Sequence, residues 1–286
     1  MKGIPHWRIR SLIESALAED IGSEDITTSS IFPEPVKAEG RIRAKEECIV
    51  AGAEIAREVF FTIDQSLALD GTAIADGSRV KPGDTILFIS CDGRTILKGE
   101  RVALNFLQRL SGIATLTSKY LEMIDGFDVK ILDTRKTTPG LRDIEKGAIR
   151  IGGGYNHRFS LSQAVLIKDN HIILAGGISE AIARVKKRIT GHLNVEVEVC
   201  SPAEAEEAFH AGADMILLDN MAIESIREVV KTINRRIPIE VSGGVDLLSV
   251  REIAGAGVDY ISIGALTHSA RAVDMSMDIV PSGGQG

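Results

Sequence analysis

The feature that most constrains the fold is a regular alternation of strand-like and helix-like segments from about residue 129 onward. The strand candidates are short and rich in valine, isoleucine and leucine, and they end in polar residues or glycine. They cover residues 129–135, 164–170, 194–199, 215–220, 238–243 and 260–265. Amphipathic helical segments lie between them, for example Ile178, Ile182, Val185 and Ile189 on one helical face. Repeated strand–helix units predict a parallel sheet with helical crossovers.

The position of the polar residues favours a barrel over an open sheet. They gather at the carboxyl ends of the strand candidates, where a (β/α) barrel carries its chemistry. The last two units, IEVSGGV and ISIGALTHSA, contain glycine turns suited to a phosphate site. An open dinucleotide-binding sheet would need a GxGxxG fingerprint after its first strand, and the sequence has none. With AIRIG (148–152) as a seventh strand candidate, the sequence predicts an incomplete (β/α) barrel of about six or seven strands.

The first hundred residues have a different pattern. A short amphipathic helix at residues 9–17, a strand region at 36–50 and a helix at 51–64 precede short strands that are separated by Asp-Gly and Pro-Gly turns, up to residue 97. This pattern is typical of an α+β domain with a small antiparallel sheet. A long helical pattern from Glu100 to about Ile124 bridges the two parts. We therefore expect an N-terminal domain over 1–112, a barrel over 113–275 and a C-terminal tail over 276–286 whose PSGGQG end is disordered.

Composition excludes several classes of function. The net charge of −7 argues against nucleic acid as the main partner. No apolar stretch approaches the roughly 20 residues of a membrane helix, and no signal region is present. The cysteines, Cys48, Cys91 and Cys200, fit no CxxC pattern, which indicates a reduced, cytoplasmic protein.

Positive charge is concentrated in one segment of this acidic chain. Residues 135–171 contain seven lysines and arginines against three acids. A local cationic excess indicates a small anionic ligand, although a solvated basic loop or ion pairs with Asp133 and Asp219 are the alternatives. The candidate binding residues at the barrel mouth are Arg135, Lys136, His157, Arg158 and Lys168. Arginine offers a planar donor fork and lysine a compact charge, both suited to carboxylate or phosphate. His157 is a candidate acid–base group or hydrogen-bond donor, with a structural histidine as the alternative.

Three acids form a second candidate group. Glu196 and Glu198 share one face of a strand, and the valines that flank them make that face the barrel interior. Asp219 ends the next strand candidate. Oxygen ligands without histidine or cysteine neighbours suit Mg²⁺ held jointly with substrate phosphates, so Glu198 and Asp219 are the candidate metal ligands. An interior salt bridge to Lys168 is the alternative, and the two interpretations are compatible.

The order of these motifs resembles that of a known family. DTRKTTPG, GGGYNHR, LIKDNH, VEVEV, LLDN and the SGG turn, with LAEDIGSEDITT and ERVALNFLQRLSGIAT before them, are similar to the signature blocks of quinolinate phosphoribosyltransferases. The similarity covers roughly residues 10 to 270. One departure is Ser160, where a small residue such as glycine is common, and we expect no functional consequence.

The resemblance implies a fold, a reaction and an assembly. The fold is an N-terminal α/β open-faced sandwich followed by an incomplete (β/α) barrel. The substrates are quinolinate and phosphoribosyl pyrophosphate with Mg²⁺, and the products are nicotinate mononucleotide, pyrophosphate and CO₂, in NAD biosynthesis. The assembly is a head-to-tail homodimer with shared active sites, with a hexamer as the alternative.

The resemblance also implies a role for each candidate residue. Arg135, Lys136, His157 and Arg158 would bind the quinolinate carboxylates, and Arg101 would reach in from the other subunit. Lys168, Glu198 and Asp219 would face the ribose, pyrophosphate and metal; the catalytic set is Lys136, Lys168, Glu198 and Asp219. The 5′-phosphate would lie against Ser242, Gly243, Gly244 and Gly264.

Two alternative functions are compatible with parts of the sequence. A relative of this family associated with molybdenum uptake shares the TRKT and glycine blocks, but the lysine of LIKDNH favours the quinolinate enzyme. The DGSRVKPGDTILFIS stretch is similar to a biotinyl–lipoyl carrier, yet Lys81 precedes Pro82 and fits poorly as a modified lysine at a hairpin tip. A purely structural role would leave the charged barrel mouth unexplained.

Overall fold

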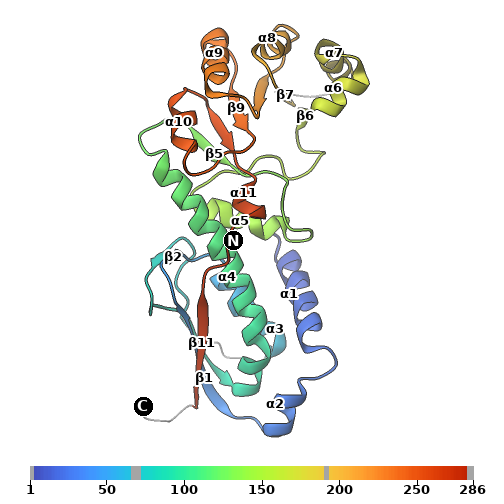
Figure 1. The fold of residues 1–286 in the computed structure, drawn as a ribbon. Coiled ribbons are helices and arrows are strands. Elements are labelled where there is room, and N and C mark those ends of the chain that lie inside the picture. The colour runs from blue at the N-terminus through green and yellow to red at the C-terminus, as the bar shows by residue number, and fades with distance from the viewer. Residues whose placement is uncertain (1–2, 66–71, 190–192, 282–286) are drawn as a thin grey trace. The chain divides into compact units, whose positions relative to one another are not determined.

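The computed structural model describes residues 3–65, 72–189 and 193–281. The chain forms two compact units, each assembled from separate segments (Figure 1). The first comprises Met1–Ser118, Thr137–Gly153 and Ser269–Gly286, and the second comprises Lys119–Lys136 and Gly154–His268. The predicted domain boundaries at 112 and 275 divide the chain into continuous stretches, whereas these units are discontinuous. Among the described residues, no helix combines the length and apolar character that a membrane span requires.

The second unit contains the predicted parallel sheet. Six strands lie in the order β5-β10-β9-β8-β7-β6, and each adjacent pair is parallel. The strands are β5 (Lys130–Leu132), β6 (Val165–Ile167), β7 (Val195–Val199), β8 (Met215–Asp219), β9 (Ile239–Ser242) and β10 (Tyr260–Ser262). Among the described residues this sheet has six strands and does not close, so the prediction of an incomplete barrel is confirmed.

The seventh strand candidate was wrong. Residues 148–151 of AIRIG form the end of helix α5 (Arg142–Ile151) in the first unit. Ile144, Ala148 and Ile149 are fully or almost fully buried, and their spacing is that of one helical face. The helical burial pattern therefore overrides the strand-like composition of this short stretch.

In the second unit at least one helix follows each of the strands β6 to β10 along the chain. These helices are α6 (Asp169–Ala175), α7 (Ile178–Arg188), α8 (Pro202–His210), α9 (Ile223–Ile233), α10 (Val250–Gly255) and α11 (Ala265–His268). Figure 1 shows α7, α8 and α9 side by side in chain order, and α8 contacts both α7 and α9. Ser201 caps α8 by accepting a hydrogen bond from the Glu204 N–H, and Pro202 stands at its first position. This packing fixes the strands whose carboxyl ends carry the candidate residues.

The first unit is an α+β assembly around an antiparallel sheet. Its main sheet has the order β11-β1-β4, from β1 (Lys37–Ala44), β4 (Thr85–Asp92) and β11 (Met275–Pro281). β2 (Cys48–Ile49) and β3 (Arg79–Val80) form a second pair. The helices are α1 (His6–Ile21), α2 (Ile26–Ile31), α3 (Ala53–Ile63), α5, and most of α4 (Gly93–Met123).

Two details of this unit differ from the sequence prediction. The bridging helix α4 begins at Gly93, so residues 93–97 are helical rather than a strand. Residues 276–281, expected in the tail, lie in β11 and pair with Ala38–Arg43 of β1. Only residues 282–286 of the expected tail remain, and they lie outside the described residues. The second difference comes from a partner far away in the sequence, because β1 pairs with β11.

Glu145 of α5 lies at the centre of a buried polar group in the first unit. Its carboxylate is fully buried and Oε1 accepts a hydrogen bond from Nη2 of Arg109 at 2.8 Å. The same carboxylate accepts two hydrogen bonds from Thr138, from the backbone N–H at 3.0 Å and from the hydroxyl at 2.8 Å. Thr138 stands two residues after Lys136 in the chain. Glu145 therefore anchors the segment that follows the cationic pair Arg135–Lys136.

Candidate active site

A cavity of about 490 Å³ lies in the second unit at the carboxyl ends of its strands. All but two of the residues to which the resemblance gave a role line it: Arg135, Lys136, His157, Arg158, Lys168, Glu198, Asp219, Ser242, Gly243 and Gly244. Six further lining residues were not predicted: Thr134, Leu166, Leu217, Asn220, Glu240 and Ser262. The topology thus brings the cationic segment, the acids and the glycine turn to one place.

The two remaining predicted residues lie elsewhere. Arg101 is exposed on α4 in the first unit and is not among the described residues that line this cavity. Gly264, after β10, lies directly behind Lys136. A Cβ atom at position 264 would come within 3.0 Å of Cδ of Lys136 and 3.1 Å of Nε2 of His268. A glycine at 264 therefore leaves the space that the Lys136 side chain occupies.

Cationic side chains line one part of the cavity. Arg158 donates a hydrogen bond from Nη1 to the carbonyl of Ala164 at 3.0 Å. Burial lowers the pKa of Arg158, the nearby Arg135 lowers it further, and Glu196 opposes the shift. Like charges held together in this way favour the binding of an anion, because an anion relieves their repulsion.

The acids lie on neighbouring strands. Glu198 of β7 forms an ion pair with Nζ of Lys168, so the predicted alternative of an interior salt bridge is realised. Asp219, at the end of β8, accepts a hydrogen bond from the side-chain amide of Asn220 at 2.7 Å. Parallel pairing of β7 with β8 brings their carboxyl ends to the same rim. The two carboxylates can therefore act on one ligand.

The turn after β9 depends on glycine. Gly243 and Gly244 both have positive φ angles, 91° and 60°. A Cβ atom at position 243 would come within 2.3 Å of Oδ1 and 2.7 Å of the backbone nitrogen of Asn220, whereas at 244 the nearest atom is 4.0 Å away. Successive backbone N–H groups in such a turn form an anion-binding concavity.

This difference between the two glycines gives a matched pair of variants. With phosphoribosyl pyrophosphate, the substrate that the sequence resemblance implies, Gly243→Ala should raise the KM by about tenfold, because both the left-handed backbone and the contact with Asn220 resist a side chain. Gly244→Ala should have a smaller effect, since it meets the backbone cost alone. Steady-state kinetics with each substrate varied in turn will check this, and equal effects of the two variants would contradict it.

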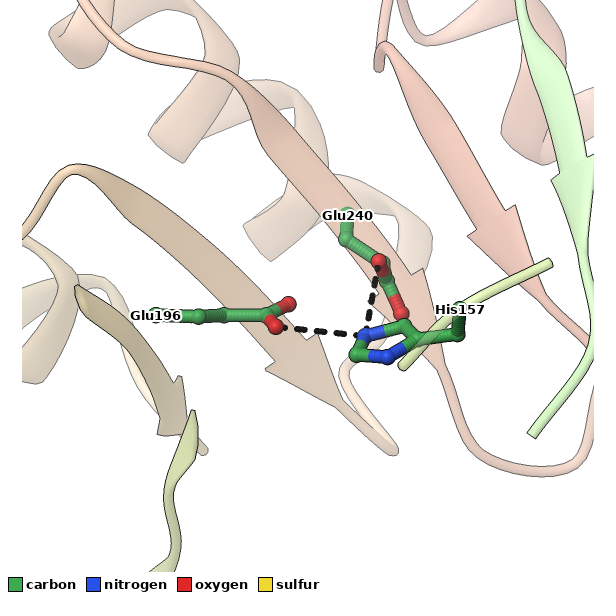
Figure 2. Close-up of side chains that lie close together, drawn as sticks. All are labelled: His157, Glu196 and Glu240. Carbon is green, nitrogen blue, oxygen red and sulfur yellow. Dashed lines mark ion pairs between the residues drawn. The ribbon is translucent and has the colours of Figure 1, made fainter. Parts of the chain in front are cut away.

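His157 lies beside two buried glutamates, Glu196 and Glu240 (Figure 2). Its Nε2 is 3.2 Å from Oε2 of Glu196 and 3.6 Å from Oε2 of Glu240, as the dashed lines in the figure mark. Its Nδ1 accepts a hydrogen bond from the backbone N–H of Arg158 at 2.8 Å. Its own backbone N–H donates to Oδ1 of the buried Asp133 at 2.9 Å. The imidazole is therefore tied to β7, to β9 and to the segment that carries Arg158.

Glu240 is the functional candidate that the sequence analysis missed. It is fully buried, and its carboxylate oxygens make no hydrogen bond with the described residues. The signal was present in the strand Ile239–Ser242, because alternation places Glu240 on the face opposite to Ile239 and Val241. An acid on that face points to the barrel interior, as Glu196 does.

Burial raises the pKa of Glu240 to about 7, the charge of Glu196 adds to the shift, and His157 opposes it. A carboxyl group whose pKa is raised in the folded state binds more protons there than when unfolded. Its contribution to stability is therefore complete below about pH 4.5 and is lost as the pH rises toward 7.

Glu240→Gln should remove this loss of stability, because glutamine does not ionise. The melting temperature of the variant minus that of the parent should therefore be higher at pH 8 than at pH 5. Thermal melts at the two pH values test this, and a pH-independent difference would contradict it.

Comparisons with known proteins agree on one family. The model for the quinolinate phosphoribosyl transferase N-terminal domain matches residues 25–111, and that for the C-terminal domain matches residues 113–278. A probable nicotinate-nucleotide pyrophosphorylase [carboxylating] of Bacillus subtilis is 43% identical, covering 97% of this chain and 95% of the relative. Quinolinate phosphoribosyltransferase [decarboxylating] 1b of Nicotiana tabacum is 40% identical, covering 96% of this chain and 83% of the relative.

Solved structures give the same result. The crystal structure of NadC from Streptococcus pyogenes has a TM-score of 0.93 and 42% identity, covering 98% of this chain and 99% of that chain. The nicotinate-nucleotide pyrophosphorylase from Francisella tularensis has a TM-score of 0.91 and 39% identity, covering 97% and 98% of the two chains. Both parts of the chain match a domain of one family, in order and over nearly their full length, and the chain therefore belongs to the quinolinate phosphoribosyl transferase family.

Proposed function

We propose that this protein transfers the phosphoribosyl group of phosphoribosyl pyrophosphate to quinolinate, with loss of CO₂, and so forms nicotinate mononucleotide for NAD biosynthesis. The observation that carries the proposal is the cavity itself. It combines the cations Arg135, Lys136, Arg158 and Lys168 with two carboxylates and a glycine turn. Quinolinate is a dicarboxylate and phosphoribosyl pyrophosphate a polyanion, so both substrates need concentrated positive charge.

The transfer step requires positioning and electrostatics. The pyridine nitrogen of quinolinate forms a bond to ribose C1, and the bond from C1 to pyrophosphate breaks with its electron pair on the leaving oxygen. The transition state resembles an oxocarbenium ion, which the carboxylates of Glu198 and Asp219 would stabilise. The cation of Lys168 would lie near the leaving pyrophosphate. Holding two substrates in line in this way can lower the barrier by about 7–11 kcal/mol.

Decarboxylation follows from the product of the transfer. The ring nitrogen is now quaternary, so the bond from the adjacent ring carbon to its carboxylate can break with the electron pair left on that carbon beside the cationic nitrogen. CO₂ departs and the carbon takes up a proton. No covalent enzyme nucleophile is needed, which leaves Lys168 as a charge rather than a Schiff-base lysine. Arg135, Lys136 and Arg158 would hold the carboxylates during this step.

Mg²⁺ is the cofactor that we propose. Glu198 and Asp219 are oxygen donors at neighbouring strand ends, and Mg²⁺ commonly uses one or two carboxylates together with substrate phosphates. Because Glu198 is already paired with Lys168, the donor set fits a metal that arrives with the phosphates better than a permanently bound one. When bound, the metal would neutralise charge on the leaving pyrophosphate.

We also propose a homodimer with shared sites, acting in the cytoplasm. Arg101 is exposed in the first unit, and an arginine supplied by a partner subunit would complete the carboxylate site. The three cysteines are free, as expected for a reducing compartment. Assembly into a hexamer is the alternative to the dimer.

A direct assay tests the reaction. The protein is mixed with phosphoribosyl pyrophosphate, Mg²⁺ and either quinolinate or nicotinate, and nicotinate mononucleotide and CO₂ are measured. Product from quinolinate alone would support the reaction and the need for the second carboxylate. A folded dimer that makes no product from either would exclude the proposed reaction and favour the molybdenum-associated relative.

A further inference from the structure

Both backbone polar groups of Lys136 are held by threonine side chains of the second unit. The N–H of Lys136 donates to Oγ1 of Thr134 at 3.0 Å, and its carbonyl accepts from the hydroxyl of Thr267 at 2.7 Å. Thr134 lines the cavity. Thr267, in α11, is fully buried and is not among the described residues that line the cavity. A hydroxyl placed in this way would act on a substrate through the residue that it holds.

The hydroxyl of Thr267 has one proton and two carbonyl groups within reach. It lies 2.7 Å from the carbonyl of Lys136 and 3.2 Å from that of Gly264, and the shorter of these is the usual distance for an O–H donor. The Gly264 carbonyl already accepts from the backbone N–H groups of Thr267 and His268, at 3.1 and 3.2 Å. The hydroxyl proton therefore goes to Lys136, and not to the preceding turn of the helix, where threonine hydroxyls often bond.

The side chain of Lys136 packs against the same part of the chain. A Cβ atom at Gly264 would come within 3.0 Å of Cδ of Lys136. Just before these positions, β10 pairs with β5 up to Ser262 and Leu132, and the N–H of Ile263 also donates to the carbonyl of Leu132 at 2.9 Å. The two segments therefore leave paired strands side by side, which brings α11 against the backbone and the stem of Lys136.

We propose that Thr267 is a positioning residue for the transfer reaction, whose hydroxyl fixes the backbone of Lys136 so that the ammonium group meets the substrate at a preset place. The proposal rests on the proposed function for the role of Lys136. Lysine carries its charge on a flexible stem, so a fixed backbone and a packed stem reduce the conformational freedom that is lost when an anion binds. A misplacement of about 1 Å can lower a rate by about two orders of magnitude.

A hydroxyl that only stabilises α11 is the alternative, and Thr117 provides the comparison for it. Thr117 is also fully buried, and its hydroxyl donates to the carbonyl of Ile113 within α4 at 2.8 Å. Loss of either hydroxyl removes one buried hydrogen bond to a carbonyl, so the two losses should reduce stability to a similar extent. Of these two threonines, Thr267 alone is bonded to a residue that lines the cavity.

Steady-state kinetics of three variants separates the two roles. Thr267→Val replaces the hydroxyl by a methyl group and should lower kcat/KM for quinolinate by about tenfold, the effect of one lost hydrogen bond. Thr267→Ser keeps the hydroxyl and should stay within about twofold of the parent. Thr117→Val, the matched control, should keep parental kinetics, with a melting temperature close to that of Thr267→Val. Parental kinetics in Thr267→Val, or an equal loss in Thr267→Ser, would overturn the proposal.

A double-mutant cycle shows whether Thr267 acts through Lys136. Isothermal titration with quinolinate gives a Kd for each variant even where turnover is too slow to measure. In the Lys136→Ala background, Thr267→Val should change the Kd by less than about twofold, because the side chain that it positions is already absent. The same fold-change in both backgrounds would show that the two residues act independently and would contradict the proposal.

Crystal structures of the parent, Thr267→Val and Thr267→Ser test the positioning without any substrate. Lys136 should be displaced by more than about 0.5 Å in the valine variant, beyond the tolerance of a binding constellation, and should keep its place in the serine variant. An unmoved Lys136 in Thr267→Val would overturn the proposal. If the protein neither binds nor uses quinolinate, the proposed function fails, and the three structures still decide whether Thr267 holds Lys136 in place.

Discussion

Arg101→Ala should lower kcat/KM for quinolinate by about 10²- to 10³-fold while leaving the fold intact. Removing one partner of a desolvated cation–carboxylate pair costs about 2–5 kcal/mol of binding. The folded state should be unaffected, because Arg101 is exposed on α4. Circular dichroism and size-exclusion chromatography will check the fold, and steady-state kinetics the activity. Lys119→Ala, at another exposed cation of α4, is the matched control and should behave as the parent does.

Complementation shows whether Arg101 acts across subunits. Lys168 lines the cavity and Arg101 does not, so a hybrid dimer of Arg101→Ala with Lys168→Ala would hold one intact site and one doubly altered site. Random hybrids from co-expression should therefore recover about a quarter of the parental activity, although each variant alone is almost inactive. Hybrids that form but stay inactive would place Arg101 in the site of its own chain. A fully active Arg101→Ala dimer would remove the shared site altogether.

The alternation of strands and helices could be predicted from the sequence because it depends on residues that are close together in the chain. Each strand of the second unit is a short apolar run followed by an amphipathic helix, so periodicity alone locates it. The errors lie where a distant partner decides the structure. AIRIG is helical because one face of α5 is buried, and residues 276–281 are a strand because β1 offers them an edge.

The site residues could be predicted from the sequence where the residue type is unusual for its position. Cations and glycines after apolar strands, such as Lys168 and Gly243, are conspicuous at a barrel mouth. Glu240 was overlooked because a single acid within IEVS gives no cluster signal, and only the three-dimensional structure places it beside Glu196 and His157. The direction of each hydrogen bond to the imidazole also has no counterpart in sequence patterns.

Glu145→Ala should destabilise the protein by about 3–5 kcal/mol, because it removes the acceptor from a buried ion pair and leaves Arg109 without this carboxylate. Two further hydrogen bonds, both from Thr138, are lost with it. The free energy of unfolding from urea titrations measures the effect. Glu14→Ala is the matched control in the same unit: its carboxylate pairs with Arg10 one helical turn away at the surface, and such pairs contribute only about 0.3–0.5 kcal/mol.

The same substitution separates stability from positioning. The segment after Lys136 is held through Thr138, so releasing it should also raise the KM for quinolinate in the fraction that remains folded. Glu145→Gln keeps an oxygen that can accept from Thr138 but loses the charge that pairs with Arg109. It should therefore restore much of the KM while recovering only part of the stability. If Glu145→Ala were no more destabilising than Glu14→Ala, the buried carboxylate would not be what fixes this segment.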